Sequence, residues 1–479
     1  MAKTNCGGNK GAVKAEVKTI ATQIQAETQE KAKDGGKAGH SNEGELKAEL
    51  KGAKFGNDLN GSGLEDDDVC KLNIKTHTND SRTYTDSNPP GHNQHRGPCT
   101  GKGTNIFKIG DRWKPADNGH VEQQHNDVLF PPRRLDMCTS NLESLNTNNP
   151  GLNDKDTAIH SLLGDVMLSA KTEAEEIIKL YDQSAKSGAT SDKDTKCRAM
   201  KYSFADLGDI IRGRDMWNNS DMTKLEQYLV KIFEKIKDTE EIKKIGKYNS
   251  DNEPYTQLRD DWWTANRDQI WTAMKCGTVT CDSETPLDDY IPQELRWLDE
   301  WSHQYCNQRK TLADNVVSEC QKCKDASDTY HKNNSGGSAK ECGNNSSECG
   351  NCNKSACEKC KQACSDYKNF VSSTGGSATN KNDWRKQWKD MNTRYHDLMK
   401  KARDEIETKS KSPQNAGGPS GTSTTTTCSG NNQCVDSFFQ NLHDKGYTTL
   451  SSYISKMSTT DCGGDKHVVA TNTCGITYI

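Results

Sequence analysis

Two closely spaced groups of cysteines are the residues most suited to metal or redox chemistry. Cys320 and Cys323 form one Cys-x2-Cys pair, and Cys357 and Cys360 form a second pair that is followed by Cys364. Two such pairs can supply the four thiolates of a structural zinc site. Three further cysteines lie between the pairs, and this crowding favours disulfides over metal ligation. We therefore expect disulfides here, with zinc or an iron–sulfur cluster as the alternative.

A cluster of acidic and basic residues is the second candidate for chemistry. Asp206, Asp209, Arg212, Arg214 and Asp215 follow one another closely in the sequence. Carboxylates in such a cluster could act as general acids or bases. On a helix, however, Asp209 and Arg212 are three residues apart and can form an ion pair. We interpret the cluster as a structural ion-pair network, with an active site as the alternative.

The sequence lacks the common catalytic motifs. It contains no Gly-x-Ser-x-Gly, His-Glu-x-x-His or phosphate-binding loop pattern. Its 12 histidines are scattered, mostly in polar segments, and none has an obvious nucleophile as a partner. We therefore expect no enzymatic activity, no cofactor and no bound metal.

The composition is typical of an oxidised, extracellular protein. The chain has 479 residues and 20 cysteines, only 31% of its residues are hydrophobic, and its net charge is −4. A polar chain with an even number of cysteines predicts a disulfide-stabilised fold, and the charge does not favour nucleic acid as a partner. There is no run of 18 apolar residues and no secretory signal. We expect a fragment of a larger exported protein that reaches a membrane only through the rest of that protein.

Apolar residues at helical spacing predict the elements that position these groups. Asp289 is a candidate N-terminal cap, with Pro292 in the first turn of the helix that follows. The apolar seam that begins at Trp384 should pack antiparallel to that long helix. Helices are predicted over residues 12–32, 163–181, 222–236, 258–274, 289–320, 384–406, 435–442 and 450–457.

One predicted helix carries an excess of positive charge. Residues 381–411 contain ten Lys or Arg and six Asp or Glu. A solvated helix face accounts for this pattern, and contact with an acidic receptor patch or a sulfated glycan is the alternative. The spacing of Trp384, Trp388 and Tyr395 places them in the core, so they are excluded from a binding surface.

Several sequence blocks occur together and in one order between residues 131 and 301. They are PPRRLDMC ending at Cys138, FADLGDIIRG from Phe204, DWW from Asp261, AMKC ending at Cys276, and DYIPQ from Asp289 with the RW and EW pairs that follow. Together they resemble the Duffy-binding-like domains of the Plasmodium falciparum erythrocyte membrane protein one family. The members of this family are variant adhesins displayed on infected red cells.

The resemblance implies an all-α, disulfide-rich fold with three subdomains, and the predicted elements follow the same order. Residues 1–157 would form an N-terminal helix and a largely irregular, disulfide-pinned segment. Residues 158–305 would form a helical bundle, and residues 306–479 would form long antiparallel helices with a cysteine-rich loop. The resemblance also implies that Cys197 pairs with Cys276 and that Cys70 pairs with Cys99.

The C-terminal sequence DSFFQNLHDKGYTTLSSYIS is most similar to the beta subclass, some members of which bind intercellular adhesion molecule one. In one such group, a loop after the long helix carries an Asn-x-Gly-Gly-Pro core. Asn415, Gly417, Gly418 and Pro419 match this core, whereas Gly421 replaces the aromatic residue that follows it and no Gly-Pro-Pro-x3-His occurs downstream.

We therefore expect an extracellular adhesion domain on the outer face of the infected erythrocyte membrane. It would bind a host endothelial or erythrocyte receptor protein, for which intercellular adhesion molecule one is a candidate. The binding surface is expected within residues 381–430, with Lys400 and Arg403 joining the loop residues Asn415, Gly417, Gly418 and Pro419. A sulfated-glycan-binding module is the alternative.

Overall fold

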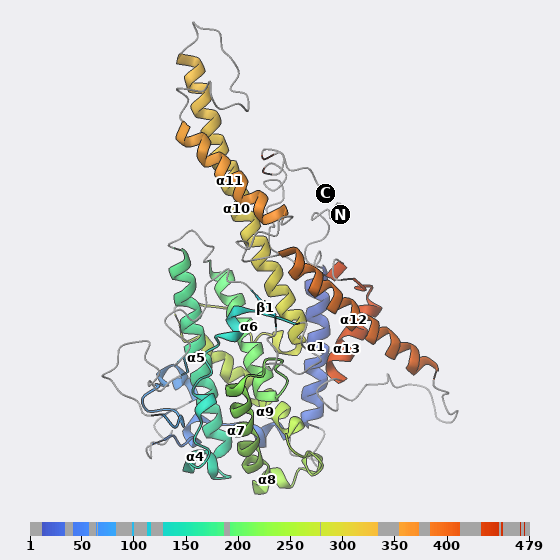
Figure 1. The fold of residues 1–479 in the computed structure, drawn as a ribbon. Helices are drawn as coiled ribbons and strands as arrows, with labels where there is room; N and C mark the ends of the chain where they lie inside the picture. The colour runs from blue at the N-terminus through green and yellow to red at the C-terminus, as the bar shows by residue number, and fades with distance from the viewer. Residues whose placement is uncertain are drawn as a thin grey trace. The chain divides into compact units, whose positions relative to one another are not determined.

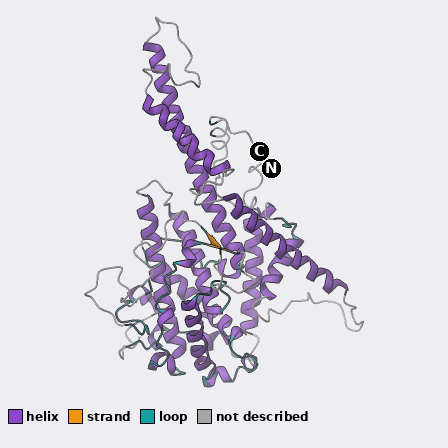
Figure 2. Ribbon diagram, in the orientation of Figure 1, coloured by secondary structure: helices purple, strands orange, loops and turns teal. Residues whose placement is uncertain are grey.

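Helices dominate the computed structural model (Figures 1 and 2). Two short strands, β1 (Lys114–Pro115) and β2 (Leu129–Phe130), pair antiparallel. With the disulfides described below, this architecture confirms the predicted all-α, disulfide-rich fold. None of the described helices combines the length and apolar character needed to cross a bilayer. The structure describes residues 12–33, 42–56, 64, 66–82, 98–99, 113–115, 128–185, 192–277, 279–333, 354–372, 384–411, 433–449, 452–453, 470 and 474.

The chain divides into two units. The larger unit holds Val13–Leu298 and Met391–Ser452, and the smaller unit holds Met1–Ala12, Asp299–Asp390 and Tyr453–Ile479. The division into subdomains at residues 157 and 305 stays a prediction. The helices of the described residues are α1 (Ala12–Lys33), α2 (Asn42–Leu46), α3 (Pro132–Leu135), α4 (Pro150–Asn153), α5 (Ala158–Ala185), α6 (Lys193–Arg212), α7 (Ser220–Lys237), α8 (Glu240–Lys243), α9 (Thr256–Met274), α10 (Gln293–Asn333), α11 (Lys354–Ser372), α12 (Trp384–Lys411) and α13 (Gln433–Asp444).

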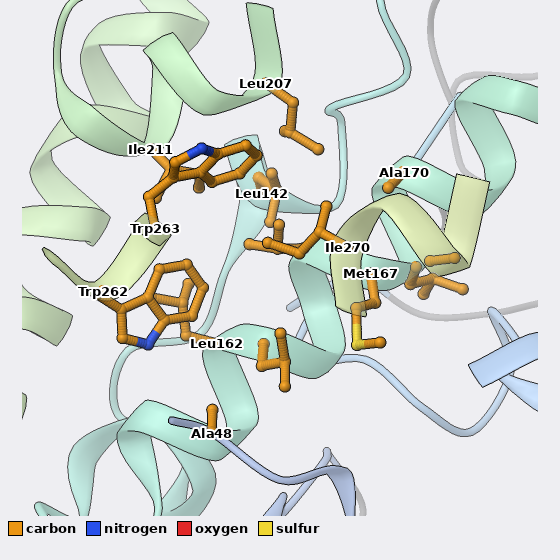
Figure 3. Packing of buried hydrophobic residues seen from close by; sticks show 14 of the residues in the cluster. Ala48, Leu142, Leu162, Met167, Ala170, Leu207, Ile211, Trp262, Trp263 and Ile270 are labelled. Atoms are coloured by element: carbon orange, nitrogen blue, oxygen red, sulfur yellow. The ribbon is translucent and has the colours of Figure 1, made fainter. Parts of the chain in front are cut away.

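The core of the larger unit forms where α9 packs against α5 and α6. Trp262, Trp263 and Trp271 of α9 are fully buried there. Each buried indole removes roughly 150–250 Å² from water, which contributes about 4 to 6 kcal/mol of burial free energy. Figure 3 shows the centre of this core, with Trp262, Trp263 and Ile270 of α9, Leu162, Met167 and Ala170 of α5, and Leu207 and Ile211 of α6.

Local sequence fixes both ends of α6. The side chain of Asp192 accepts a hydrogen bond from the backbone N–H of Thr195, which satisfies a free donor of the first turn. The helix ends at Arg212 and is capped by Gly213, whose φ of 71° is left-handed and favours glycine. Inside the helix, Gly208 lets α9 approach closely, because a Cβ at this position would lie 2.7 Å from the Trp263 ring.

Three disulfides tie the larger unit together. Cys70 of the 3-10 turn η3 (Asp66–Lys71) is bonded to Cys276, and Cys197 of α6 is bonded to Cys281. Cys99 is bonded to Cys138.

The expected pairings of Cys197 with Cys276 and of Cys70 with Cys99 are therefore wrong, although all four cysteines are in disulfides. A disulfide needs Cα atoms within about 7 Å of each other. Because η3 packs against α9, the Cα atom of Cys70 lies 5.2 Å from that of Cys276. The Cα atoms of Cys197 and Cys281 are 5.6 Å apart.

In the smaller unit, α10 and α11 form an antiparallel pair (Figure 1). Cys320 is bonded to Cys360, and Cys323, three residues later on α10, is bonded to Cys357, three residues earlier on α11. Aromatic stacking continues this pairing at Tyr305, whose ring centroid lies 5.3 Å from that of a phenylalanine on α11. The predicted helix starting at Asp289 was expected to reach residue 320, and α10 extends further, to Asn333.

The seam of α12 faces α10, as predicted. In the smaller unit, the Trp388 ring lies 5.9 Å from the Trp301 ring. In the larger unit, Arg394 forms an ion pair with Glu294. Because Glu294 precedes Trp301 whereas Arg394 follows Trp388, the two helices run antiparallel.

Candidate functional site

The Asp/Arg cluster is a buried network centred on Asp206 of α6. Its carboxylate accepts hydrogen bonds from Arg133 of α3 at 2.6 Å and from Arg296 of α10 at 2.7 Å. All three side chains are at most 2% exposed. Burial alone would raise the pKa of Asp206, but the two guanidinium groups outweigh this effect and lower the pKa to about 2. Asp206 is therefore an ionised structural anion and is poorly suited to proton transfer near neutral pH.

The same pattern continues around this centre. Arg134 pairs with Asp215, and Arg212 donates to Asp209 at 3.0 Å. Arg214, at the edge of the network, pairs with Asp260 of α9. The interpretation of the cluster as structural ion pairs is confirmed, because its arginines join α3, α6, α9 and α10 through these pairs.

Asp289 belongs to this network and does not act as the predicted helix cap. It lies in the 3-10 turn η7 (Asp288–Tyr290), and α10 begins after it. Its carboxylate accepts from the indole N–H of Trp263 at 2.8 Å and from Arg267 at 2.6 Å. Both carboxylate oxygens therefore accept hydrogen bonds from side chains of α9, one of them the charged guanidinium of Arg267, and not from the backbone of the first turn of α10.

The cysteine motifs of α10 and α11 form disulfides, as expected. Cys320–Cys360 and Cys323–Cys357 join the two helices, and Cys364 is bonded to Cys474. Zinc ligation requires thiolates, and a sulfur atom within a disulfide carries no thiolate charge. The two Cys-x2-Cys pairs therefore serve as cross-links in this structure.

The inner face of α12 fixes the helix on the larger unit. Tyr395, Met399 and Ala402 are buried. The hydroxyl of Tyr395 donates to the backbone carbonyl of Tyr447 at 2.8 Å, and its ring lies edge-on to Phe439 of α13. Tyr395 therefore lies in the core as predicted, and the residues on the other face of α12 have a rigid support.

The outer face of α12 carries the predicted contact residues. Lys400 and Arg403 are both exposed, and Lys401 between them is exposed as well. Arg403 also lies 3.7 Å from Asp404, so its charge is partly balanced. The other predicted contact residues, Asn415, Gly417, Gly418 and Pro419, lie outside the described residues, in the segment that follows α12.

A small cavity beneath α12 was not predicted from the sequence. It has a volume of about 50 Å³ and lies between β2, the start of α10 and the inner face of α12. Its wall is mostly apolar and includes Leu129, Trp297, Met391 and Leu398, with Arg394 among the polar residues. The apolar seam marks Met391 and Leu398 as inward-facing, but no sequence signal brings Leu129 beside them.

Comparison with known proteins identifies the family. Residues 127–296 match the model of the Duffy binding domain. The Duffy receptor of Plasmodium vivax is 26% identical over 210 residues, which cover 40% of this chain and 17% of the receptor. This chain thus spans about a fifth of the length of the curated relatives that it matches.

Several solved structures match nearly the whole chain, among them two PfEMP1 domains. The first, an ICAM-1-binding PfEMP1 DBLbeta domain, is 35% identical with a TM-score of 0.65, and the match covers 93% of this chain and 91% of that domain. The second, a DBLb domain of PfEMP1 bound to human ICAM-1, is 30% identical with a TM-score of 0.65, over 94% of this chain and 89% of that one. From the shared helices and the identity over almost its full length, the chain belongs to the Duffy-binding-like domains of PfEMP1 and matches their beta subclass.

Proposed function

We propose that this chain is the adhesion domain of a variant surface antigen and binds a host cell-surface receptor protein. Its location would be the outer face of the infected erythrocyte, as part of a longer membrane-anchored protein. The observation that carries the proposal is the 35% identity, over 93% of the chain, to a DBLbeta domain that binds ICAM-1. ICAM-1 is therefore the first receptor to test, and no catalytic step is involved.

The outer face of α12 and the segment after it are the proposed binding surface. Tyr395 and Met399 anchor the helix to the larger unit, so its exposed residues are held in fixed positions. Fixed side chains lose little conformational entropy on binding, which favours affinity. Lys400 and Arg403 would attract an acidic receptor patch, while the segment that contains Asn415–Pro419 would add contacts specific to the receptor.

The direct test is binding of the oxidised chain to immobilised host receptors, measured by surface plasmon resonance. The panel would contain ICAM-1, other endothelial adhesion receptors and erythrocyte surface proteins. We expect saturable binding to one member of the panel and loss of that binding after the disulfides are reduced. If no host surface protein binds the oxidised chain, the proposal is wrong.

A sulfated glycan is the second candidate ligand. The observation that favours it is the exposure of Lys400, Lys401 and Arg403 within one turn of α12. Exposed charges lose most of their attraction at high ionic strength, where the Debye length falls to about 3 Å at 1 M salt. Retention on heparin that disappears by about 0.5 M salt would favour the glycan. Receptor binding that persists at this salt concentration would favour the protein ligand.

A further inference from the structure

Three sulfur atoms from two different disulfides lie together in the smaller unit. The Sγ atoms of Cys320, Cys360 and Cys364 are all within 4.8 Å of one another, and all three residues are partly exposed. Cys320 is bonded to Cys360, whereas Cys364 is bonded to Cys474. A thiolate at Cys364 would therefore lie directly beside an intact disulfide.

The helices explain why these sulfurs meet. Cys360 and Cys364 are one turn apart on α11, so both are on the side that faces α10. Cys474, the partner of Cys364, packs against the same core cluster as Cys320 and Cys364. Its backbone N–H donates to the carbonyl of Ala470 at 3.0 Å. Ala470 itself is fully buried in the core of this unit.

We propose that Cys364 is a relay thiol. When the Cys364–Cys474 disulfide is reduced, thiol–disulfide exchange through Cys364 leaves Cys360 as the second free thiol. A dithiol attacks Cys474 Sγ, opens the Cys364–Cys474 bond and releases Cys364 as a thiolate. That thiolate then attacks Cys320 Sγ, forms a Cys320–Cys364 disulfide and expels Cys360 as a thiolate. The cross-link between α10 and α11 thereby moves by one helical turn along α11, and the covalent link to Cys474 is lost.

The electrons balance across the two steps. The dithiol closes to its own disulfide and reduces one protein disulfide, so Cys474 and Cys360 end as thiols. The exchange within the protein is neutral, because one disulfide forms as another breaks. Attack on Cys360 instead of Cys320 is disfavoured, since Cβ atoms four residues apart on a helix are about 5–6 Å apart and a disulfide requires about 3.5–4.5 Å.

The consequence is a redox-controlled release of Cys474 that leaves the α10–α11 pair cross-linked. Cys323–Cys357 is not consumed, and the new Cys320–Cys364 bond replaces the one that is lost. Without the relay, reduction at Cys474 would leave its free partner at Cys364. With the relay, the second free thiol is Cys360, so the position of that thiol distinguishes the two cases.

The first experiment uses the full oxidised chain and limiting dithiothreitol. The reaction is stopped with acid, free thiols are alkylated, and the peptides are mapped without reduction. In molecules that have lost one disulfide, we expect labels on Cys474 and Cys360 and a peptide that joins Cys320 to Cys364. Labels on Cys474 and Cys364 with Cys320–Cys360 intact would overturn the relay, and so would labels spread over all cysteines.

The second experiment needs no reductant. Cys474→Ser leaves Cys364 unpaired, and we expect alkylation to appear at Cys360 with time, at a rate that rises about tenfold per pH unit below the thiol pKa of about 8.5. Cys281→Ser is the matched control, because it leaves Cys197 unpaired, away from the only close group of three potential ligand residues found in the described part of the chain. Its label should stay on Cys197. A label that remains on Cys364 at every pH would refute the proposal.

Discussion

Cys70 is bonded to Cys276 across 206 residues of the chain, with Cα atoms 5.2 Å apart. Cys276 lies two residues after the end of α9, the helix that carries three fully buried tryptophans, and Cys70 belongs to the turn η3. The bond therefore attaches the early turn η3 to the end of the central helix α9. The stability of the larger unit should therefore depend on the Cys70–Cys276 disulfide.

Removing this bond should destabilise the fold strongly. A Cys70→Ser, Cys276→Ser double variant loses a cross-link that closes a loop of 206 residues, and we expect roughly 5 kcal/mol less unfolding free energy in urea titrations. The matched control is Cys99→Ser with Cys138→Ser, which opens a loop of only 39 residues and should cost less. Non-reducing peptide maps test the pairing itself, and a peptide that links Cys197 to Cys276 would contradict the structure.

Neutralising Asp206 should also destabilise the protein. Asp206→Asn keeps the shape of the side chain but leaves Arg133 and Arg296 buried with less compensating charge, which we expect to cost about 3 to 5 kcal/mol. Glu175→Gln is the control, since its pair with Lys171 is partly exposed and should contribute no more than about 1 kcal/mol. Equal shifts of the urea midpoint in the two variants would show that the network does not support the fold.

The lowered pKa of Asp206 predicts that the protein loses stability at low pH. The folded pKa of Asp206, about 2, lies below its ordinary value of 3.8. The stability that it contributes is therefore complete above about pH 4 and is lost as the pH falls through 2. The difference in unfolding free energy between the wild type and Asp206→Asn should shrink over this range. A difference that stays constant from pH 5 to pH 2 would be inconsistent with the lowered pKa.

Asp165 should show the opposite pH dependence. This buried residue of α5 accepts from the Thr78 hydroxyl at 2.6 Å and from the side-chain amide of Asn79 at 2.8 Å, but burial outweighs these bonds and raises its pKa to about 6. Its contribution to stability is present below the unfolded pKa of about 4 and is lost as the pH rises through 6.

Asp165→Asn removes this titration. Relative to the variant, the wild type should gain on the order of 3 kcal/mol in unfolding free energy between pH 7 and pH 4. Parallel urea titrations at both pH values measure the change. A wild type that loses stability relative to Asp165→Asn on acidification would reverse the expected sign.

Charge reversal on α12 tests the proposed receptor surface. A Lys400→Glu, Arg403→Glu double variant should reduce the association rate with the bound receptor about tenfold or more at low salt, because both residues are exposed and cationic. Lys231→Glu on the exposed side of α7 is a control with half the change in charge, and it should change binding little. If the control reduces binding as much as the α12 variant does, attraction to the whole chain explains the effect and α12 is not the site.

Much of the helical framework could be predicted from local patterns. The stripe from Leu258 to Met274 is buried in α9, and the spacing that places Tyr395 inward agrees with its buried hydroxyl. These predictions succeed because a helix repeats every 3.6 residues, so one apolar face is visible within a short window. The sequence also indicated that Asp209 and Arg212 can pair, since residues three apart on a helix are neighbours.

Other features were decided by tertiary packing alone. The order of the cysteines does not show that Cys70 meets Cys276, because a disulfide requires two Cα atoms within about 7 Å and only the packing of η3 on α9 brings them together. Asp289 likewise resembles a helix cap in the sequence. In the structure, its carboxylate instead accepts hydrogen bonds from Trp263 and Arg267 of α9. By itself, the sequence determined many of the long helices and which of their faces turn inward. Tertiary structure determined the partners of these residues, because a partner distant in sequence becomes a neighbour only after the helices pack.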